Sequence, residues 1–541
     1  MADTVSPDQA QLSKRRGTGN SANPMWGGLT FISRTGRGTA DAVASYPLMR
    51  PPAETGAADG AASRDLNPAT APGAWEEAWS FELDVRARGA VVEITVRADD
   101  AEERRSCSTH RLDPGRHQSY LDLFADLGRR YGTRPAGRAA AAPRTADPAV
   151  RPVLDQNLSS RILYGYGDPA VTRVEAADGS TRWWLYVTSN DAPDAFPILS
   201  SDDLESWRLE GFVFPQGATP EWAMTRAGQA DFWAPEMHRI GGDFVVCFAA
   251  RERSGDLAVG LARASAPEGP FAAGETPLIR GGVIDPHIVA DPEGAPYLVW
   301  KEDANDRWPR LTAALLDRDP TLVARLFSSK RDRRAAALCS RLVELSPDAG
   351  PMETFFMLQP LIEAAADNFP GFRARLAELG GDATLDGDQR RLAEAARLAT
   401  RTAIRAQRLT DDLAALTGES RVILENDLAW EAHLVEGPWI SRIGGRYVLF
   451  YAGNDFSTDR YGIGVAVADH PLGPYRKAAE PLLQSTEAWL APGHPSVTLD
   501  AEGQPRMFLH AFPPGRVGYK VFRALLTAPL VDENGGVRLG S

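Results

Sequence analysis

A short proline-containing segment that leads into an apolar strand recurs five times in this chain. The five proline segments are GDPAVTRV around Asp168, WAPEMHRI from Trp233, IDPHIVAD around Asp285, VEGPWISRI around Glu436 and PGHPSVTLD around His494. They follow one another at intervals of roughly 50 to 65 residues, except for one interval of roughly 150. Self-similarity at this period, with several strands in each unit, is typical of β-propeller blades.

A second strand pattern follows each proline segment. Its copies are RWWLYVTS from Arg182, GGDFVVCFAA from Gly241, APYLVWKE from Ala295, GGRYVLFYAG from Gly444 and the weaker PRMFLHAF from Pro505. Between Leu434 and Tyr475, alternating apolar residues and a Gly-Gly turn predict an antiparallel meander, with strands at 447–451 and 462–468. We therefore predict a mainly β fold in which residues 151–541 form a five-bladed β-propeller.

The long interval coincides with a change of periodicity. Between Pro309 and Thr400 the apolar residues recur at helical spacing, which predicts a helical insertion at residues 310–400 within the propeller. Segments 309–316 and 402–409 both fit the strand that would continue the interrupted blade. The insertion could serve as a packing layer, a lid or a dimer surface, because long insertions in compact folds are often functional.

The N-terminal part has a different composition. Residues 1–74 are rich in polar residues, Ala, Gly and Pro, which indicates a disordered or irregular segment. Alternating apolar and polar residues from Trp75 to Arg111 predict a small β-rich region, so we assign residues 75–150 to an accessory region and linker. A carbohydrate-binding module and a simple packing element both fit this pattern.

Composition limits the kinds of partner. The net charge of −13 argues against nucleic acid or an anionic membrane, because phosphate groups bind basic surfaces. Three widely spaced cysteines indicate neither a disulfide framework nor a zinc site. The first residues lack the apolar stretch of a secretory signal, so we expect a cytoplasmic protein. The oligomeric state is not indicated by the sequence.

The acidic residues of the proline segments carry the candidate chemistry. The innermost strand of each propeller blade faces the central axis, so Asp168, Asp285 and Glu436 are expected to converge on one pocket together with His494. Hydrolysis of a glycosidic bond needs one carboxylic acid to protonate the leaving oxygen and one carboxylate to activate water or attack carbon. A third carboxylate can raise the pKa of the acid through repulsion between like charges.

A purely structural interpretation also exists, because Asp before Pro favours turns. It accounts well for one such dipeptide. Two Asp-Pro dipeptides and one Glu-Gly-Pro, each at the same place in a repeat, favour a shared chemical role.

The ordered motifs resemble those of glycoside hydrolase family 43, which comprises inverting five-bladed propeller enzymes that act on arabinofuranosides and xylosides. The motifs are GDPAV, WAPEMH, IDPHIVADPEGAPYLVW, VEGPWI with GRYVLFYAGN, and APGHPSV, and the resemblance covers about Gly165 to Asp532 outside the helical insertion. It implies that Asp168 is the general base for water, that Glu436 is the general acid, and that Asp285 tunes and orients the acid.

The resemblance implies substrate-binding roles for three further residues. His494 matches a central histidine that in many members contacts substrate or a calcium ion in the axial channel. Trp233 would line the sugar pocket as a stacking platform, although a blade-core aromatic fits the same position. Arg523 resembles an arginine near the end of the last blade, but Lys-Val-Phe-Arg replaces the usual Gly-Gly-Arg context.

The implied activity is that of an inverting glycosidase, an α-L-arabinofuranosidase or β-xylosidase, acting on an oligosaccharide or glycoside. No cofactor is required beyond a possible structural calcium. A fructoside-specific propeller is disfavoured, because Gly167 precedes Asp168 and Gly437 follows Glu436 where that group has Asn-Asp-Pro and Glu-Cys motifs. A glycan-binding or biosynthetic propeller without hydrolytic activity is the alternative from another class.

Overall fold

A computed structural model of the chain divides into two compact units, which are described separately. One comprises Pro143–Ala304 with Arg401–Ser541, and the other comprises Met1–Ala142 with Asn305–Thr400. The described residues are 147 and 149–541, without 176–177, 191, 226–229, most of 329–350, 515–516, 519–520, 534–535 and 541; before residue 147 only the strands named below are described.

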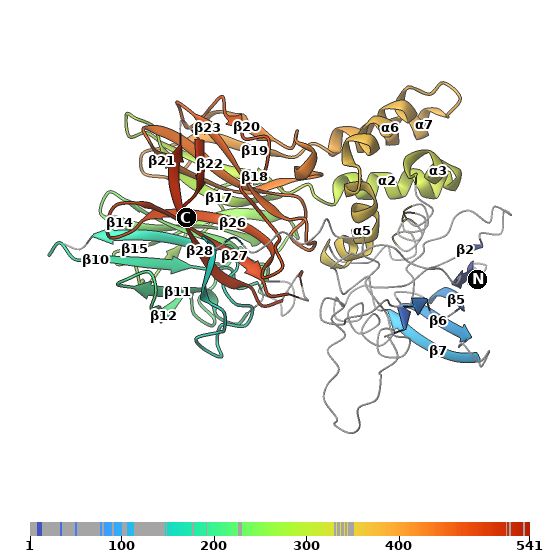
Figure 1. The fold of residues 1–541 in the computed structure, drawn as a ribbon, viewed down its shortest axis with the longest axis horizontal. Coiled ribbons are helices and arrows are strands. Elements are labelled where there is room, and N and C mark those ends of the chain that lie inside the picture. Colours follow the sequence, from blue (N-terminus) through green and yellow to red (C-terminus); the bar gives the residue numbers. More distant parts are fainter. Residues whose placement is uncertain are drawn as a thin grey trace. The chain divides into compact units, whose positions relative to one another are not determined.

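The described part of the first unit contains five antiparallel sheets (Figure 1). Their strands, in chain order, are β9 (Ala170–Glu175), β10 (Thr181–Tyr186), β11 (Ala195–Ser201) and β12 (Arg208–Phe214); β13 (Trp233–Ile240), β14 (Asp243–Arg251), β15 (Leu257–Ala264) and β16 (Ala272–Ala273); β17 (Val283–Ala290), β18 (Pro296–Glu302), β19 (Ala403–Leu409) and β20 (Leu416–Glu425); β21 (Val435–Ile443), β22 (Arg446–Gly453), β23 (Gly462–Ala468), β24 (Arg476–Lys477) and β25 (Leu483–Gln484); and β26 (Leu490–Leu499), β27 (Pro505–Phe512), β28 (Ala524–Glu533) and β29 (Gly536–Leu539). The predicted meander is confirmed as β21 to β23.

The sheets form a ring. The first strand of each sheet lies beside the first strand of the next, and β26 of the last sheet lies beside β9 of the first. Strand β8 (Arg151–Leu154) precedes the first sheet in the chain but pairs with β28 of the last sheet. The last sheet therefore contains strands from both ends of the propeller sequence. This arrangement confirms the predicted five-bladed propeller.

The apolar core lies between neighbouring blades. Each buried cluster combines side chains from at least two adjacent sheets, because both faces of a blade are covered by other blades. The strands accordingly read as nearly continuous apolar runs, such as Asp243–Arg251, in which every residue after the first is buried.

The residue before each motif proline adopts a left-handed backbone conformation. The φ angles are 52° for Asp168, 45° for Ala234, 54° for Asp285, 56° for Gly437 and 47° for His494. In four of the five blades the strand register shifts at this point, as in a β-bulge. A bulge bends the strand and re-aims nearby side chains, so this local distortion helps to set the direction of the axial residues in those four blades.

Helices make up the described part of Asn305–Thr400. They are α2 (Arg307–Arg318), the 3₁₀ turn η1 (Pro320–Leu322), α3 (Val323–Leu326), α5 (Pro351–Ala366), α6 (Phe369–Gly381) and α7 (Gly387–Ala399). The fully buried Trp308 packs against the rings of Phe369 and Phe372. The predicted helical insertion is therefore confirmed. Of the two candidate strands, 402–409 provides β19, whereas 309–316 lies in α2 because its apolar residues occupy one helical face.

The N-terminal segment contributes β1 (Asp8–Leu12), β2 (Ser33–Arg34), β5 (Ser80–Arg88), β6 (Val91–Asp99) and β7 (Arg105–Leu112), in the sheet order β2-β1-β5-β6-β7. The short strands β3 (Met49–Arg50) and β4 (Glu76–Glu77) form a separate pair. The predicted β-rich region includes β5 to β7. The remaining positions of the predicted irregular segment 1–74 and of the linker lie outside the described residues, apart from β1 to β3 and the linker positions from 147 onward.

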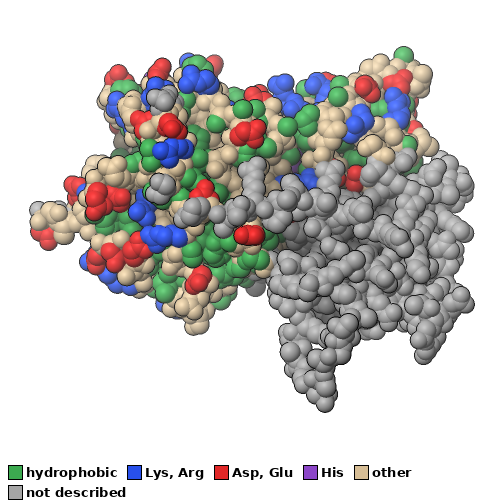
Figure 2. All heavy atoms as spheres, in the orientation of Figure 1, with side chains coloured by type: hydrophobic (Ala, Val, Ile, Leu, Met, Phe, Trp, Pro, Cys, Tyr) green, Lys and Arg blue, Asp and Glu red, His purple; other side chains and the backbone are tan. Residues whose placement is uncertain are grey.

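The drawn face of the molecule carries acidic and basic side chains intermixed over the described surface (Figure 2). Among the described helices, none combines the length and apolar character needed to cross a membrane.

Leu154 provides a test of the contribution of β8. It is buried against a cluster that includes Phe508 and Leu525 of the last blade. We expect Leu154→Ala to lower the free energy of unfolding of the propeller by about 2–4 kcal/mol, because truncation of a buried leucine side chain leaves a cavity. Urea denaturation would measure this, with the exposed neighbour substitution Asp155→Ala as control. Equal stability of the two variants would contradict a structural role for β8 pairing.

Candidate active site

Three carboxyl groups from three blades interact at the propeller axis. Asp168 precedes β9, Asp285 lies in β17 and Glu436 lies in β21. The charge of Asp168 raises the pKa of Asp285, and the charge of Asp285 in turn raises the pKa of Glu436. The structure therefore brings together the three acidic residues that the sequence singled out.

Asp168 is held as an anion. Its Oδ1 accepts a hydrogen bond from Arg523 Nη1 at 2.8 Å, and its Oδ2 accepts one from the Thr188 hydroxyl. Burial raises its pKa, but Arg523, His494 and the Thr188 hydrogen bond together outweigh burial, so the pKa lies well below its usual range. Arg523 reaches this position over Gly167, where a Cβ atom would lie 1.8 Å from the guanidinium carbon.

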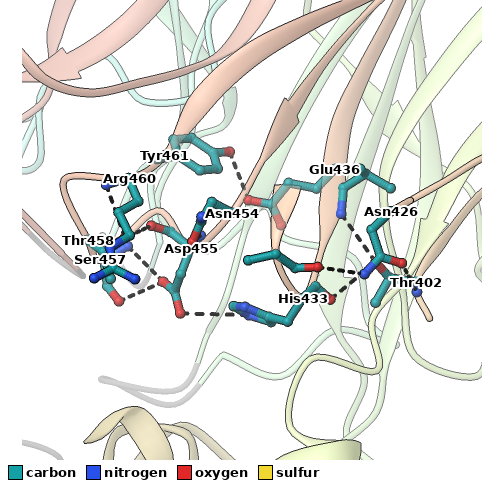
Figure 3. Close-up of polar contacts among 12 residues, drawn as sticks. Thr402, Asn426, His433, Glu436, Asn454, Asp455, Ser457, Thr458, Arg460 and Tyr461 are labelled. Carbon is teal, nitrogen blue, oxygen red and sulfur yellow. Dashed lines mark hydrogen bonds and ion pairs between the residues drawn. The ribbon is translucent and has the colours of Figure 1, made fainter. Parts of the chain in front are cut away.

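The surroundings of Glu436 favour its protonated form. Its Oε1 accepts a hydrogen bond from the Tyr461 hydroxyl at 2.8 Å, and Lys301 Nζ lies 3.7 Å from its Oε2. Burial raises the pKa of Glu436 to about 7, with Lys301 opposing this shift and Asp285 adding to it. Figure 3 shows the Tyr461 side chain directed at the Glu436 carboxyl group.

Tyr461 is positioned by the loop that precedes it. Asp455 accepts hydrogen bonds from the backbone N–H and the hydroxyl of Ser457, and its backbone carbonyl accepts one from Thr458 Oγ1 (Figure 3). His433 Nε2 lies 3.8 Å from Asp455 Oδ2. Burial, together with the charge of Glu436, keeps the pKa of Tyr461 well above its usual value, so the phenol remains a donor.

Asp285 connects the third and fourth blades. Its Oδ2 accepts a hydrogen bond from the Gly437 backbone N–H at 2.8 Å. Burial raises the pKa of Asp285, and the positive charge of Lys301 and this hydrogen bond oppose the shift. A side chain at Gly437 would lie 3.0 Å from the His494 ring, so glycine lets the fourth and fifth blades approach each other.

The left-handed residues share a pattern of hydrogen bonds between blades. Three of them donate their backbone N–H to a side chain of the preceding blade: Asp168 to His510 Nδ1 at 3.1 Å, Ala234 to Thr188 Oγ1 at 2.8 Å and Gly437 to Asp285 Oδ2. Because Thr188 also donates to Asp168, it links the second proline segment to the candidate base.

His494 Nδ1 lies 3.5 Å from Asp168 Oδ1, which places this predicted residue in the site. Calcium takes six to eight oxygen ligands. Among the described residues, Asp168 supplies the one carboxylate within ion-pair distance of His494. These side chains do not fit a calcium ion held by direct protein ligands, and calcium stays a prediction without support here.

Trp233 is half-buried at the start of β13. Its Nε1 donates a hydrogen bond to Asn190 Oδ1 at 3.1 Å, and its ring packs against a small cluster that contains Ile284. The hydrogen bond fixes the orientation of the ring. Both predicted roles, a sugar platform and a blade-core aromatic, remain compatible with this placement.

Four residues of the site were not predicted from the sequence, namely Lys301, Tyr461, Thr188 and His510. Lys301 and His510 carried a signal, because each is a titratable residue within an otherwise apolar strand pattern, LVWKE and MFLHAF. His510 is buried, and its Nε2 has no hydrogen-bond partner among the described residues. Burial lowers the pKa of His510 well below its usual value, so its Nδ1 accepts from the Asp168 backbone as a neutral ring.

A second polar cluster lies on β13, β14 and β17. Ligand atoms of Glu236, His238 and Cys247 lie within 4.8 Å of one another. The Ile440 N–H donates to His287 Nε2, which leaves His287 Nδ1 to donate to Glu236 Oε2 at 2.6 Å. Cys247 donates toward two backbone carbonyl oxygens, an environment for a thiol rather than for a metal-bound thiolate. This cluster therefore joins blades through hydrogen bonds.

Arg523 provides a test of how the candidate base is kept ionised. We expect Arg523→Met to raise the pKa of the Asp168 carboxyl group by about 1 to 3 units, because an opposite charge in contact is lost. Carboxyl ¹³C NMR titration, with Asp168→Asn used to assign the signal, would measure the change. Arg523→Lys retains the positive charge and should show a smaller shift. An unchanged pKa in Arg523→Met would contradict the dominance of this ion pair.

Comparison with known proteins places these motifs in one family. The model for glycosyl hydrolases family 43 matches residues 162–330 and 387–535. Xylosidase/arabinosidase 43A from Humicola insolens is 33% identical over 148 residues, which cover 24% of this chain and 44% of that protein. The match thus spans less than half the length of this curated relative.

Solved structures of similar fold include a thermostable family-43 glycoside hydrolase, with 23% identity and a TM-score of 0.47 over 70% of this chain and 93% of that one. An endo-1,4-beta-xylanase from Bacteroides thetaiotaomicron has 20% identity and a TM-score of 0.45 over 70% of this chain and 95% of that one. The family match covers more than half of the chain and includes all five proline segments, so the protein belongs to glycosyl hydrolases family 43.

Proposed function

We propose that the protein is an inverting glycoside hydrolase that removes terminal pentosyl groups, arabinofuranosyl or xylosyl, from an oligosaccharide or glycoside. The observation that carries the proposal is the opposite shift of two carboxyl groups in one site. The pKa of Asp168 is lowered, whereas that of Glu436 is raised to about 7. Paired carboxyl groups whose environments separate their pKa values are typical of acid and base partners.

Asp168 is suited to act as the general base. Arg523 and Thr188 each occupy one site on a different oxygen of its carboxylate, and each oxygen has a further lone pair available for a water molecule. Because the pKa of Asp168 is low, the group stays ionised over most of the pH range in which Glu436 is protonated. Both protonation states that the reaction needs therefore coexist over a wide pH range.

Glu436 is suited to act as the general acid. At neutral and lower pH a proton on its carboxyl group can pass to the leaving glycosidic oxygen as the bond to the anomeric carbon breaks. Water deprotonated by Asp168 would attack from the opposite face, which inverts the anomeric configuration. The name of the Humicola relative, a xylosidase/arabinosidase, supports pentosides as the first substrates to test.

Aryl glycosides would test the activity and the roles together. We expect turnover of a p-nitrophenyl α-L-arabinofuranoside or β-D-xyloside in a panel that also contains the β-D-galactofuranoside and β-D-fructofuranoside. Asp168→Ala should lose roughly 10²- to 10⁴-fold in kcat. Glu436→Gln should lose far more on a methyl glycoside than on a nitrophenyl glycoside, because nitrophenolate leaves without much protonation. The exposed Asp243→Asn provides the control.

Two outcomes would contradict the proposal. The wild-type protein could be inactive on the whole panel and yet bind oligosaccharide with the same affinity as the Glu436→Gln variant. That result would favour a glycan-binding or biosynthetic propeller. A product with retained anomeric configuration, detected by ¹H NMR before mutarotation, would rule out the inverting mechanism.

The raised pKa of Glu436 predicts a pH dependence. The acid must be protonated, so kcat/KM should fall about tenfold per pH unit as the pH rises above about 7. Asp168 must be ionised, and its lowered pKa places loss of activity on the acidic side well below the usual range for Asp. A pH profile of kcat/KM measures both limits. An alkaline limit near pH 5, as for an unperturbed carboxyl group, would contradict the assignment of Glu436.

A further inference from the structure

A fully buried lysine lies beside the two carboxyl groups with raised pKa. Lys301 is 0% exposed near the end of β18. Lysine is almost never fully buried without a charged partner. Its Nζ lies 3.7 Å from Glu436 Oε2 and 3.7 Å from Asp303 Oδ1. Asp285 is close enough for its ionisation to be favoured by the Lys301 charge.

The backbone holds Lys301 rigidly. In the third blade it pairs with Ile284 of β17 on one side and with Ile404 of β19 on the other. Asp285 directly follows Ile284, so the same pair of strands supplies both the lysine and the central aspartate. The backbone at Lys301 is therefore a fixed part of the blade.

Several other charged or titratable groups face this cluster. Glu436 also interacts with Tyr461 and His494, Asp285 interacts with Asp168 and Asp303, and the charge of Lys301 reaches His433. Lys301 is the only amine or guanidinium group among the described residues within ion-pair distance of Glu436. Any change in the charge of Lys301 should therefore act on Glu436 directly.

Two neighbouring buried carboxyl groups without a cation would both tend to stay neutral, because burial and mutual repulsion disfavour ionisation. A single adjacent ammonium group can stabilise one negative charge. Asp285 receives this charge best, since the Gly437 N–H also donates to it, whereas Glu436 receives its hydrogen bond from a neutral phenol. We propose that Lys301 is a positioning residue that keeps the Asp285–Glu436 pair singly ionised, with the remaining proton on Glu436.

The role of Lys301 in catalysis rests on the proposed hydrolase function, but its effect on the charge of the Asp285–Glu436 pair does not. Removal of the ammonium group should make the second ionisation of the pair harder. Removal of the Asp303 carboxylate, which competes for the same lysine, should make it easier. The two substitutions are therefore expected to act in opposite directions.

Carboxyl ¹³C NMR titration of the full chain tests the inference without substrate, with the Glu436 signal assigned from Glu436→Gln. In Lys301→Met the ionisation midpoint of Glu436 should rise by about 1 to 3 pH units. In Asp303→Asn it should fall by a smaller amount, because Asp303 is partly exposed to solvent. Lys301→Arg retains the charge and should lie closer to wild type than Lys301→Met does.

The alkaline limit of kcat/KM should move with these midpoints, whereas a purely structural role for Lys301 would leave the pH limit of the remaining activity unchanged. A midpoint that is unchanged or lower in Lys301→Met, or higher in Asp303→Asn, overturns the inference. Should Lys301→Met fail to fold, the direction of the Asp303→Asn shift still decides. Absence of hydrolysis with the expected midpoint shifts would overturn the proposed function alone.

Discussion

The site depends on a left-handed residue held directly before proline at the axial end of each blade. Such a conformation costs of the order of 1–3 kcal/mol for a residue other than glycine, and a following proline normally favours extended backbone instead. The five sites persist because the surroundings fix them: three of the left-handed residues donate their N–H to a side chain of the preceding blade. Two of those acceptors, Thr188 and Asp285, also belong to the charge network. Fold and chemistry therefore share the same hydrogen bonds.

The environment of each carboxyl group follows from the cation that it contacts. Asp168 has the guanidinium of Arg523 in direct contact at 2.8 Å, and burial, which raises its pKa, is outweighed by Arg523 together with the other nearby groups. Glu436 and Asp285 share one nearby ammonium group, that of Lys301, which lies 3.7 Å from Glu436. Its charge lowers the pKa of both groups by less than burial raises it. Acidic residues of similar intrinsic acidity thus have pKa values shifted in opposite directions, lowered for Asp168 and raised for Asp285 and Glu436, because their neighbours differ.

Much of the fold could be predicted from the sequence, because propeller blades are built from local strands and their repetition is visible along the chain. The sequence did not decide whether residues 309–316 or 402–409 form the third strand of the interrupted blade, since both have apolar residues at suitable positions. Only packing showed that the apolar residues of 309–316 lie on one face of a helix. Lys301 and His510 were overlooked because a titratable residue in a strand can point to solvent or to the axis. Tyr461 comes from a loop whose path depends on Asp455, and no periodic pattern predicts that path.

The sequence alone determined the number of blades, the place of the helical insertion and which three acidic residues meet, because these follow from repeats and from the position of proline within each repeat. Tertiary structure alone decided how the pKa values of those residues differ. Arg523 and Lys301 come from other blades and reach Asp168 and Glu436 only when the ring of blades closes. Thr188 and Tyr461 lie in the same blades as the carboxyl groups that they contact, and reach them only when those blades fold. Electrostatic interactions depend on distance and burial in space, and neither quantity is encoded by local spacing in the chain.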